Sequence, residues 1–214
     1  MARLTTAQLD ARLLLDFEVA SAMSCPVMGV SAHRSLADAR ASRQAIRTKS
    51  EGNLARFYRV EYRIRTLAGP GKYMPSTTVV FDLLANGNYP LSEPACWVVS
   101  RPMPWSPHFK EGAVICISEE FWVDARGEIL LGHLLAHIAR LLNWDEVARG
   151  GGYVGWNGEA IRYWQCELGE KPITPGLKYP VPDPRLTHRL PGRTVTFRSA
   201  RPAPPAVFRG QCGR

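Results

Sequence analysis

The sequence predicts an α+β fold in which helices pack on an antiparallel sheet, and three observations support this prediction. An amphipathic helical pattern opens the chain, strand patterns fill residues 56–100, and a leucine-rich helical pattern begins near residue 129. A proline-rich crossing separates the last strand from the second helix, and proline disfavours both a helix and a central strand. The predicted order is helix, antiparallel meander, loop and C-terminal helices.

Three stretches have the apolar spacing or flanking signals of helices. Residues 5–24 repeat apolar side chains such as Leu9 and Phe17, and Thr5 or Thr6 can cap the first turn. The stretch "EILLGHLLAHIARLLNW" repeats leucine and isoleucine at intervals of three and four, which predicts a long amphipathic helix. "GEAIRYWQCEL" predicts a further short helix after a glycine-rich break.

The predicted strands are short segments that alternate or are rich in β-branched residues. They are "RFYRVEYRIRTL", "STTVVFDLLA" and "ACWVVS", with turns at "AGPGK" and "NGN". In the first segment Tyr58, Val60, Tyr62 and Ile64 share one face, which we expect to be buried. This spacing predicts an antiparallel meander packed against the first helix.

Length and composition predict one domain with a tail. Residues 1–170 are assigned to the domain, with residues 29–54 as a basic insertion that forms either a helix extension or a surface excursion. Residues 171–214 carry nine of the chain's 17 prolines, interleaved with arginine. This composition predicts an extended or disordered tail, with one strand-like segment at "RTVTFR".

The chain carries a formal net charge of +8, and the excess lies in residues 32–65 and after Asp183. Neither region has an RNA-binding aromatic motif or a zinc-finger spacing, so a basic solvated surface is favoured over a nucleic-acid site. No apolar run has the length of a membrane span, and the N-terminal segment does not resemble a signal peptide. We therefore expect a cytoplasmic protein without a membrane partner.

Four motifs follow one another across the proline-rich crossing. "YPLSEP" is followed by "SPH", whose histidine lies eight residues before the cysteine of "GAVICI", and a tryptophan and the leucine-rich helix come next. The residues that carry these motifs are Tyr89, Pro90, Pro94, Pro107, His108, Cys116 and Trp122. In this order they resemble the catalytic domain of ubiquitin-conjugating enzymes over residues 5–165. The resemblance implies that family's fold, with an N-terminal helix, a meander sheet, an active-site loop and C-terminal helices.

The chain also departs from the family pattern. His108 stands where the family has asparagine, Ser106 where it has histidine, and Glu93 where it has the first proline of a pair. The Gly-Gly turn before the second strand is absent, and Gly112 lies one residue early. This divergence resembles the ubiquitin-conjugating-like proteins of bacterial ubiquitin-like pathways, so we expect a role in a bacterial antiviral defence pathway.

The resemblance implies that Cys116 is the nucleophile. It would accept the C-terminus of a ubiquitin-like protein from an activating enzyme as a thioester and pass it to a lysine of a target protein. His108 would donate a ring N–H to the thioester oxygen, or it is a loop histidine that bonds only backbone. Asp145 or Glu146 would accept the proton of the lysine. Alternatively, the two are only an exposed acidic pair at the end of the long helix. Ser118, with its two acidic neighbours, would gate access to the thiol.

Partners follow from the same resemblance. They are an activating enzyme, a ubiquitin-like protein and a target, and the first is expected to dock on the N-terminal helix, where Arg3 and Arg12 are exposed candidates. No metal or nucleotide cofactor is implied, because ATP is used by the activating enzyme.

A second histidine pattern lies on the leucine-rich helix. His133 and His137 have the i, i+4 spacing of zinc metalloproteases, but Leu134 occupies the place of the glutamate base. We expect both histidines, with Arg140, to form an exposed polar face of the helix.

Two other functions stay open. A scaffold of the same fold could bind ubiquitin-like proteins without catalysis; the missing asparagine favours it and the retained Cys116 opposes it. A nucleic-acid or acidic-surface binder could use the basic segments, and its binding would weaken strongly with salt.

Overall fold

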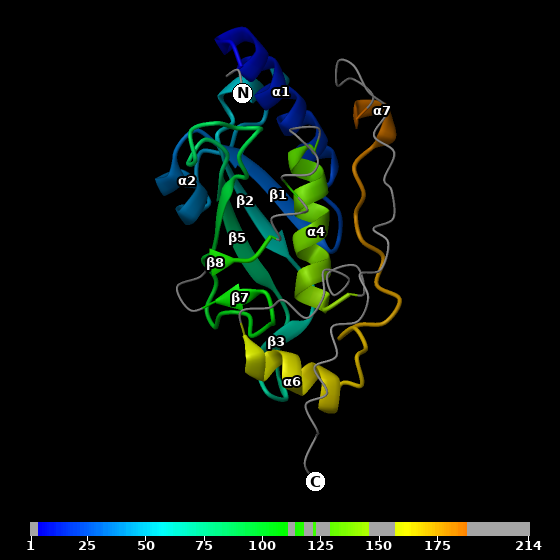
Figure 1. The fold of residues 1–214 in the computed structure, drawn as a ribbon. Helices are drawn as coiled ribbons and strands as arrows, with labels where there is room; N and C mark the ends of the chain where they lie inside the picture. The colour runs from blue at the N-terminus through cyan, green and yellow to red at the C-terminus, as the bar shows by residue number, and fades with distance from the viewer. Residues whose placement is uncertain (1–3, 111–113, 118–121, 123–128, 146–156, 188–214) are drawn as a thin grey trace.

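The structure is a computed structural model that describes residues 4–110, 114–117, 122, 129–145 and 157–187. Within these ranges an antiparallel sheet is covered by helices, and a two-stranded hairpin lies at one end (Figure 1). The predicted α+β class with an antiparallel sheet is therefore confirmed.

The main sheet has six strands in the order β1-β2-β5-β6-β8-β7, and every neighbouring pair is antiparallel. The strands are β1 (Met28–His33), β2 (Phe57–Tyr62), β5 (Thr77–Asp82), β6 (Ala95–Val98), β7 (Phe109–Lys110) and β8 (Val114–Ile115). The second sheet pairs β3 (Thr66–Gly69) with β4 (Lys72–Met74) through the predicted turn at Gly71, whose φ is 67°. The segment "RFYRVEYRIRTL" is thus divided between β2 and β3.

Residues 29–54, predicted as a basic insertion that extends a helix or forms a surface excursion, begin with a strand of the main sheet. Strand β1 pairs with β2 along its whole length, from Met28↔Tyr62 to His33↔Phe57. The strand was missed because "MGVSAH" contains few β-branched residues and no regular alternation of apolar and polar side chains. It is followed by α2 (Leu36–Ala41) and a 3₁₀ helix, η1 (Lys49–Leu54). Helix α2 packs on Phe57 and Val80, on the sheet face that carries neither α1 nor α4.

The core lies between the sheet and two helices, α1 (Thr6–Ala22) and α4 (Leu131–Asn143). Tyr58, Val60 and Tyr62 are fully buried on this face, as their alternation predicted. Thr5 caps α1, since its hydroxyl accepts a hydrogen bond from the Gln8 amide at 3.3 Å. The two helices approach closely at Gly132, where a Cβ atom would lie 2.5 Å from Val19.

Residues 171–187 form a C-terminal strap that packs against α4 and ends in the short helix α7 (Pro184–Thr187), which contacts α1. The buried Asn143 amide anchors it: the side-chain oxygen accepts from the Thr174 amide at 2.7 Å, and its nitrogen donates to the Thr174 carbonyl at 3.0 Å. That nitrogen also donates to the Tyr179 hydroxyl at 2.6 Å. This part of the predicted tail is therefore held against the domain, and "RTVTFR" lies outside the described residues.

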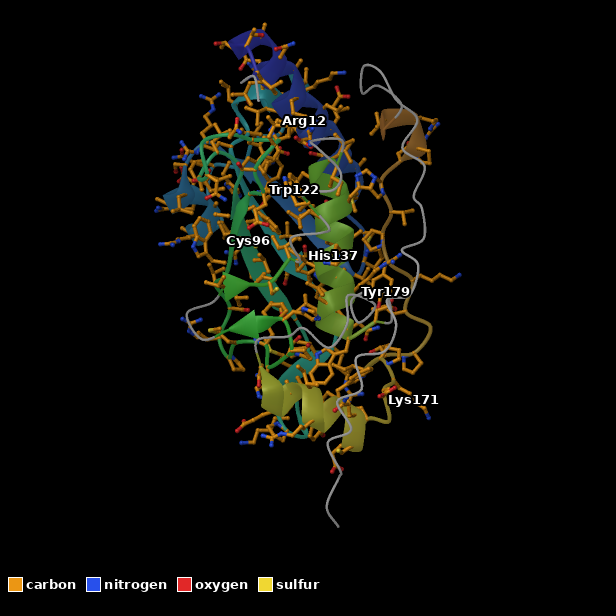
Figure 2. The ribbon with its side chains drawn as sticks, viewed as in Figure 1. Arg12, Cys96, Trp122, His137, Lys171 and Tyr179 are labelled. Carbon is orange, nitrogen blue, oxygen red and sulfur yellow. The ribbon has the colours of Figure 1, made fainter. Side chains whose placement is uncertain are left out.

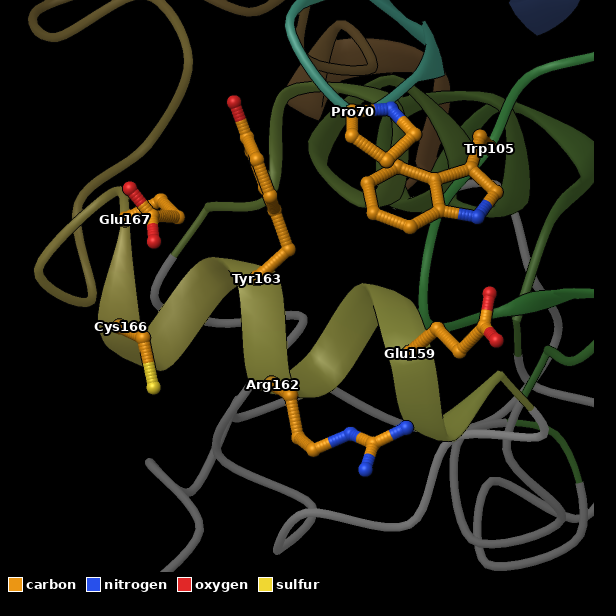
Figure 3. A pocket seen from close by; sticks show the side chains of 7 residues that line it. All are labelled: Pro70, Trp105, Glu159, Arg162, Tyr163, Cys166 and Glu167. Carbon is orange, nitrogen blue, oxygen red and sulfur yellow. The ribbon is translucent and has the colours of Figure 1, made fainter. Parts of the chain in front are cut away.

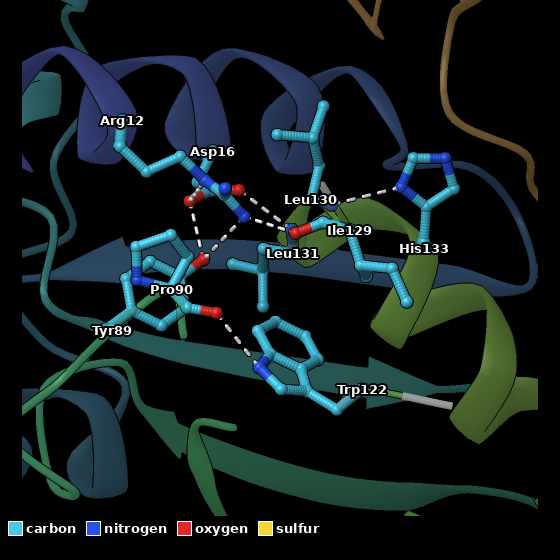
Figure 4. A network of polar contacts seen from close by, with 9 residues as sticks. All are labelled: Arg12, Asp16, Tyr89, Pro90, Trp122, Ile129, Leu130, Leu131 and His133. Atoms are coloured by element: carbon cyan, nitrogen blue, oxygen red, sulfur yellow. Dashed lines mark hydrogen bonds and ion pairs between the residues drawn. The ribbon is translucent and has the colours of Figure 1, made fainter. Parts of the chain in front are cut away.

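A buried polar network joins α1 to α4 (Figure 4). One carboxylate oxygen of Asp16 accepts from Arg12 Nε at 2.8 Å and from the Tyr89 hydroxyl at 2.5 Å. Its other oxygen accepts from the Leu131 amide at 2.8 Å, at the first residue of α4, and Arg12 donates to the Ile129 carbonyl. Burial opposes the charge of Arg12, but Asp16 and Tyr89 more than offset it, so the Arg12 pKa is raised.

The same network fixes the "YPLSEP" motif. The Trp122 indole donates to the Pro90 carbonyl at 3.1 Å, and the centroids of the Tyr89 and Trp122 rings lie 6.0 Å apart. Three of the motif residues are therefore in contact, and Pro94 is buried just before β6. The prediction that Arg12 is an exposed docking residue is wrong, because it is 7% exposed and its charge is matched by Asp16. Arg3 lies outside the described residues.

Asp16→Ala should lower the free energy of unfolding by about 3–5 kcal/mol, because it leaves the buried Arg12 charge without its partner. Chemical denaturation measures this loss. Asp10→Ala is the matched control on the same helix, since Asp10 is only partly buried, and we expect a change within about 0.5 kcal/mol. Equal losses in the two variants would contradict the role assigned to the network.

Candidate functional site

Cys116 lies directly after β8, with its side chain partly exposed and its thiol free. The two neighbours, Ile115 and Ile117, are 4% and 5% exposed and belong to the core. The Cys116 amide donates to the His108 carbonyl at 2.8 Å. Buried isoleucines on both sides and a backbone hydrogen bond thus fix the chain, while Cys116 itself is only partly buried.

The proline-rich crossing is anchored by Trp105. Its amide donates to the Leu67 carbonyl at 2.6 Å. The centroid of its ring lies 6.1 Å from that of Trp144 and 5.3 Å from that of Tyr163. These aromatic residues belong to a satellite core around α6 (Gly158–Cys166). Aromatic packing therefore holds the loop where its prolines disfavour regular secondary structure. The Arg101–Pro102 peptide bond in this loop is cis.

His108 is brought next to Cys116 by the backbone. Its amide donates to the buried Ser106 hydroxyl at 3.4 Å, and the preceding Pro107 carbonyl accepts from the Asn157 amide at 3.3 Å. Asn157 also caps α6, because its side chain accepts from the Ala160 amide at 3.1 Å. The "SPH" turn is thus held on one side by α6 and on the other by the Cys116 strand end.

His137, near the middle of α4, is a residue that sequence analysis placed wrongly (Figure 2). It was expected on an exposed polar face, but it is 9% exposed. Burial, followed by the nearby charges of His108 and Arg140, lowers the pKa of His137 to about 4, and a hydrogen bond to the Ile117 backbone acts in the opposite direction. Its spacing of three from Leu134 and four from Leu141 places it on the border of the leucine stripe, which was the signal available.

His133 has a different role from His137. Its ring Nδ1 accepts from the Leu130 amide at 3.2 Å, which satisfies a backbone donor at the start of α4, and burial lowers its pKa. In the described part of the chain, no group of three or more histidine, cysteine, aspartate or glutamate residues could hold a metal ion.

Asp145 lies at the end of α4, where its carboxylate accepts from the Tyr179 hydroxyl at 3.2 Å. Burial is the main cause that raises the pKa of Tyr179 to about 12, so this hydroxyl stays protonated and remains a donor at neutral pH. Asp145, the candidate acceptor of the lysine proton, is thus hydrogen-bonded to the strap, a contact that the sequence could not show. Glu146, Ser118 and the two glutamates after it lie outside the described residues.

A pocket of about 350 Å³ opens beside α6 and Trp105 (Figure 3). It is lined by Pro70, Trp105, Glu159, Arg162, Tyr163, Cys166 and Glu167. Tyr163 also accepts from the Gly71 amide at 3.1 Å, so this region ties α6 to the β3–β4 turn and supports the crossing loop.

Comparison with models of known protein families and with curated protein sequences found no match. Among the described residues, no helix combines the length and the apolar character that crossing a membrane requires.

Proposed function

We propose that the chain is a ubiquitin-conjugating-like acyl carrier, in which Cys116 forms a thioester with the C-terminus of a ubiquitin-like protein. The observation that carries this proposal is the position of one free, partly buried cysteine between two buried isoleucines, at the end of a loop anchored by Trp105. The order α1, antiparallel meander, crossing loop, α4 and α6 is also compatible with the family that the motifs resemble.

The first step is thioester exchange. The Cys116 thiolate attacks the carbonyl carbon of the thioester on the activating enzyme, a new carbon–sulfur bond forms, and the thiolate of that enzyme leaves. One thioester replaces another, so the step is nearly isoenergetic and the carrier mainly supplies position. ATP is consumed earlier, by the activating enzyme.

The second step transfers the acyl group to a lysine of the target. The amine attacks the same carbonyl, the amide bond forms, and the Cys116 thiolate leaves while a base takes the proton of the amine. Negative charge develops on the carbonyl oxygen, and the adjacent His108 would donate a hydrogen bond to it. The pathway expected from the divergent motifs is a bacterial ubiquitin-like pathway of antiviral defence.

Cys116→Ser should abolish the thiol-sensitive adduct that forms when the chain is mixed with the activating enzyme, ubiquitin-like protein and ATP. Non-reducing gels reveal the adduct, and serine replaces the thioester with a thiol-resistant ester or with no adduct. Cys25→Ser is the matched control, because Cys25 is also a free and partly exposed thiol, and it should charge normally. An active pair of partners that leaves the wild-type chain uncharged would favour the non-catalytic scaffold.

His108→Ala should leave charging intact and slow discharge to free lysine by about 10²–10³-fold, the usual effect of removing one oxyanion donor. Single-turnover discharge of the preformed thioester measures this rate. His108→Asn is the informative control, because it restores the residue of the family motif and should retain most of the rate. Unchanged discharge in His108→Ala would assign His108 to loop structure alone.

A further inference from the structure

We propose that the pocket beside α6 binds a basic segment of the target protein, in which two cationic side chains flank an apolar one. The inference rests on the proposed function for the identity of the bound protein. Its physical content, the binding of a basic peptide, can be tested without any partner protein.

The pocket has one wall on α6 and another on the loops that face the helix. Pro70 of the β3–β4 turn and Trp105 of the crossing loop form the facing wall (Figure 3). Ala160 and Trp164 are the buried residues of α6, and they lie on another face of the helix. The residues of α6 that line the pocket follow one another at intervals of three and four, and are Glu159, Arg162, Tyr163, Cys166 and Glu167. Helix α6 thus uses one face for the core and another for the pocket.

The charge of the pocket is set by Glu159 and Glu167. Both are exposed, and within the described part of the chain neither forms an ion pair. Arg162 lies two positions before the buried Trp164, so the helical repeat places it on the outer side of α6. Figure 3 shows its side chain pointing away from Trp105. Two carboxylates with one peripheral guanidinium favour a cationic ligand, although the whole chain carries a net charge of +8.

The centre of the pocket is apolar and aromatic. Tyr163 lies midway between the two glutamates on α6, and its ring meets that of Trp105 edge-on, with an interplanar angle of 71°. Pro70 extends this surface. The volume of about 350 Å³ is near the lower end of the range for ligand pockets, so the pocket holds a few side chains rather than a folded domain. We therefore expect an aliphatic side chain at its centre.

The positions of the two carboxylates predict the spacing of the ligand. Glu167 follows Glu159 by eight positions, which is about 12 Å along a helix that rises 1.5 Å per residue. An extended peptide advances about 3.3 Å per residue, and alternate side chains point to the same side. Two basic residues four positions apart therefore span about 13 Å on one side of the peptide, and the residue midway between them faces Tyr163.

The pocket is connected to the segment that carries Cys116. The amide of Asn157, which caps α6, donates to the Pro107 carbonyl at 3.3 Å, and the carbonyl of the next residue, His108, accepts from the Cys116 amide at 2.8 Å. Glu159 follows Asn157 by two positions, in the first turn of α6. A target segment held along α6 would thus bring a neighbouring lysine toward the thioester.

The first test is calorimetric titration of the full chain with the blocked peptide acetyl-Lys-Gly-Leu-Gly-Lys-amide. We expect binding, together with a shift of the Trp105 indole N–H signal in nuclear magnetic resonance spectra, which reports that the peptide reaches the pocket. A peptide with glutamate in place of both lysines should not bind. In acetyl-Lys-Gly-Leu-Lys-Gly-amide the second lysine points to the other side, so binding should be about two- to fivefold weaker.

Variants of the pocket residues give the same titration a sign. Glu159→Gln and Glu167→Gln should each weaken binding about two- to fivefold, the usual effect of one exposed charge pair. Arg162→Gln should strengthen it, because a like charge is removed. Asp10→Asn on α1 is the matched control, since it changes the net charge equally outside the pocket, and it should leave the affinity unchanged.

Three results of the titration would overturn the proposal. They are no binding to the wild-type chain, equal affinities in the Glu159→Gln, Glu167→Gln and Asp10→Asn variants, and binding that appears only after residues 188–214 are removed. The last result would assign the pocket to the chain's own basic segment instead of a target.

The second test is discharge of the preformed Cys116 thioester to lysine peptides. One peptide carries Arg-Gly-Leu-Gly-Arg beside the acceptor lysine, and the other has glycine in place of both arginines. The ratio of their kcat/KM values should fall about tenfold in the Glu159→Gln/Glu167→Gln double variant, because two charge pairs are lost. An unchanged ratio would contradict a role in target selection. If the wild-type chain is never charged, the proposed function fails, while the titration still decides whether the pocket binds a basic peptide.

Discussion

A single buried carboxylate, that of Asp16, is the interaction on which the arrangement of the site depends. It binds Arg12 within α1, the first amide of α4 and the Tyr89 hydroxyl at the same time. A carboxylate near the N-terminus of a helix is favoured by the helix dipole, and the Arg12 charge offsets its desolvation. These bonds fix the position of α4, and with it that of His137, relative to α1 and to the loop that carries Pro90.

The described residues of the crossing loop are held at separate points along it. Tyr89 and Pro90 are held by the network and by Trp122, Trp105 is held by the aromatic cluster on α6, and Ile115 and Ile117 are held by the core. Between these anchors, backbone bonds tie the "SPH" turn to Asn157 and to Cys116. A thiol that must meet two bulky partners in turn needs this kind of fixed presentation more than it needs a deep pocket.

Much of this arrangement follows from periodicity in the sequence. Helices α1 and α4 follow from apolar spacing, strands β2, β5 and β6 from alternation or β-branched residues, and helix α6 from the glycine-rich break before it. Strand β1 does not follow from the sequence pattern, because half of it is glycine, serine and alanine. It is defined by its pairing with β2, which is a tertiary contact. Arg12 and His137 were misplaced for a common reason. Each is a polar side chain that the tertiary structure buries: Arg12 donates to the Ile129 carbonyl, and His137 on α4 is 9% exposed.

The most direct test of the central claim is to map the acyl bond itself. The charged wild-type chain would be digested under acidic conditions that preserve thioesters, and its peptides would be weighed by mass spectrometry. The account predicts that the C-terminal remnant of the ubiquitin-like protein is found on the peptide that contains Cys116 and is released by hydroxylamine. A hydroxylamine-resistant remnant on a lysine, or a labile one on Cys25, would contradict it.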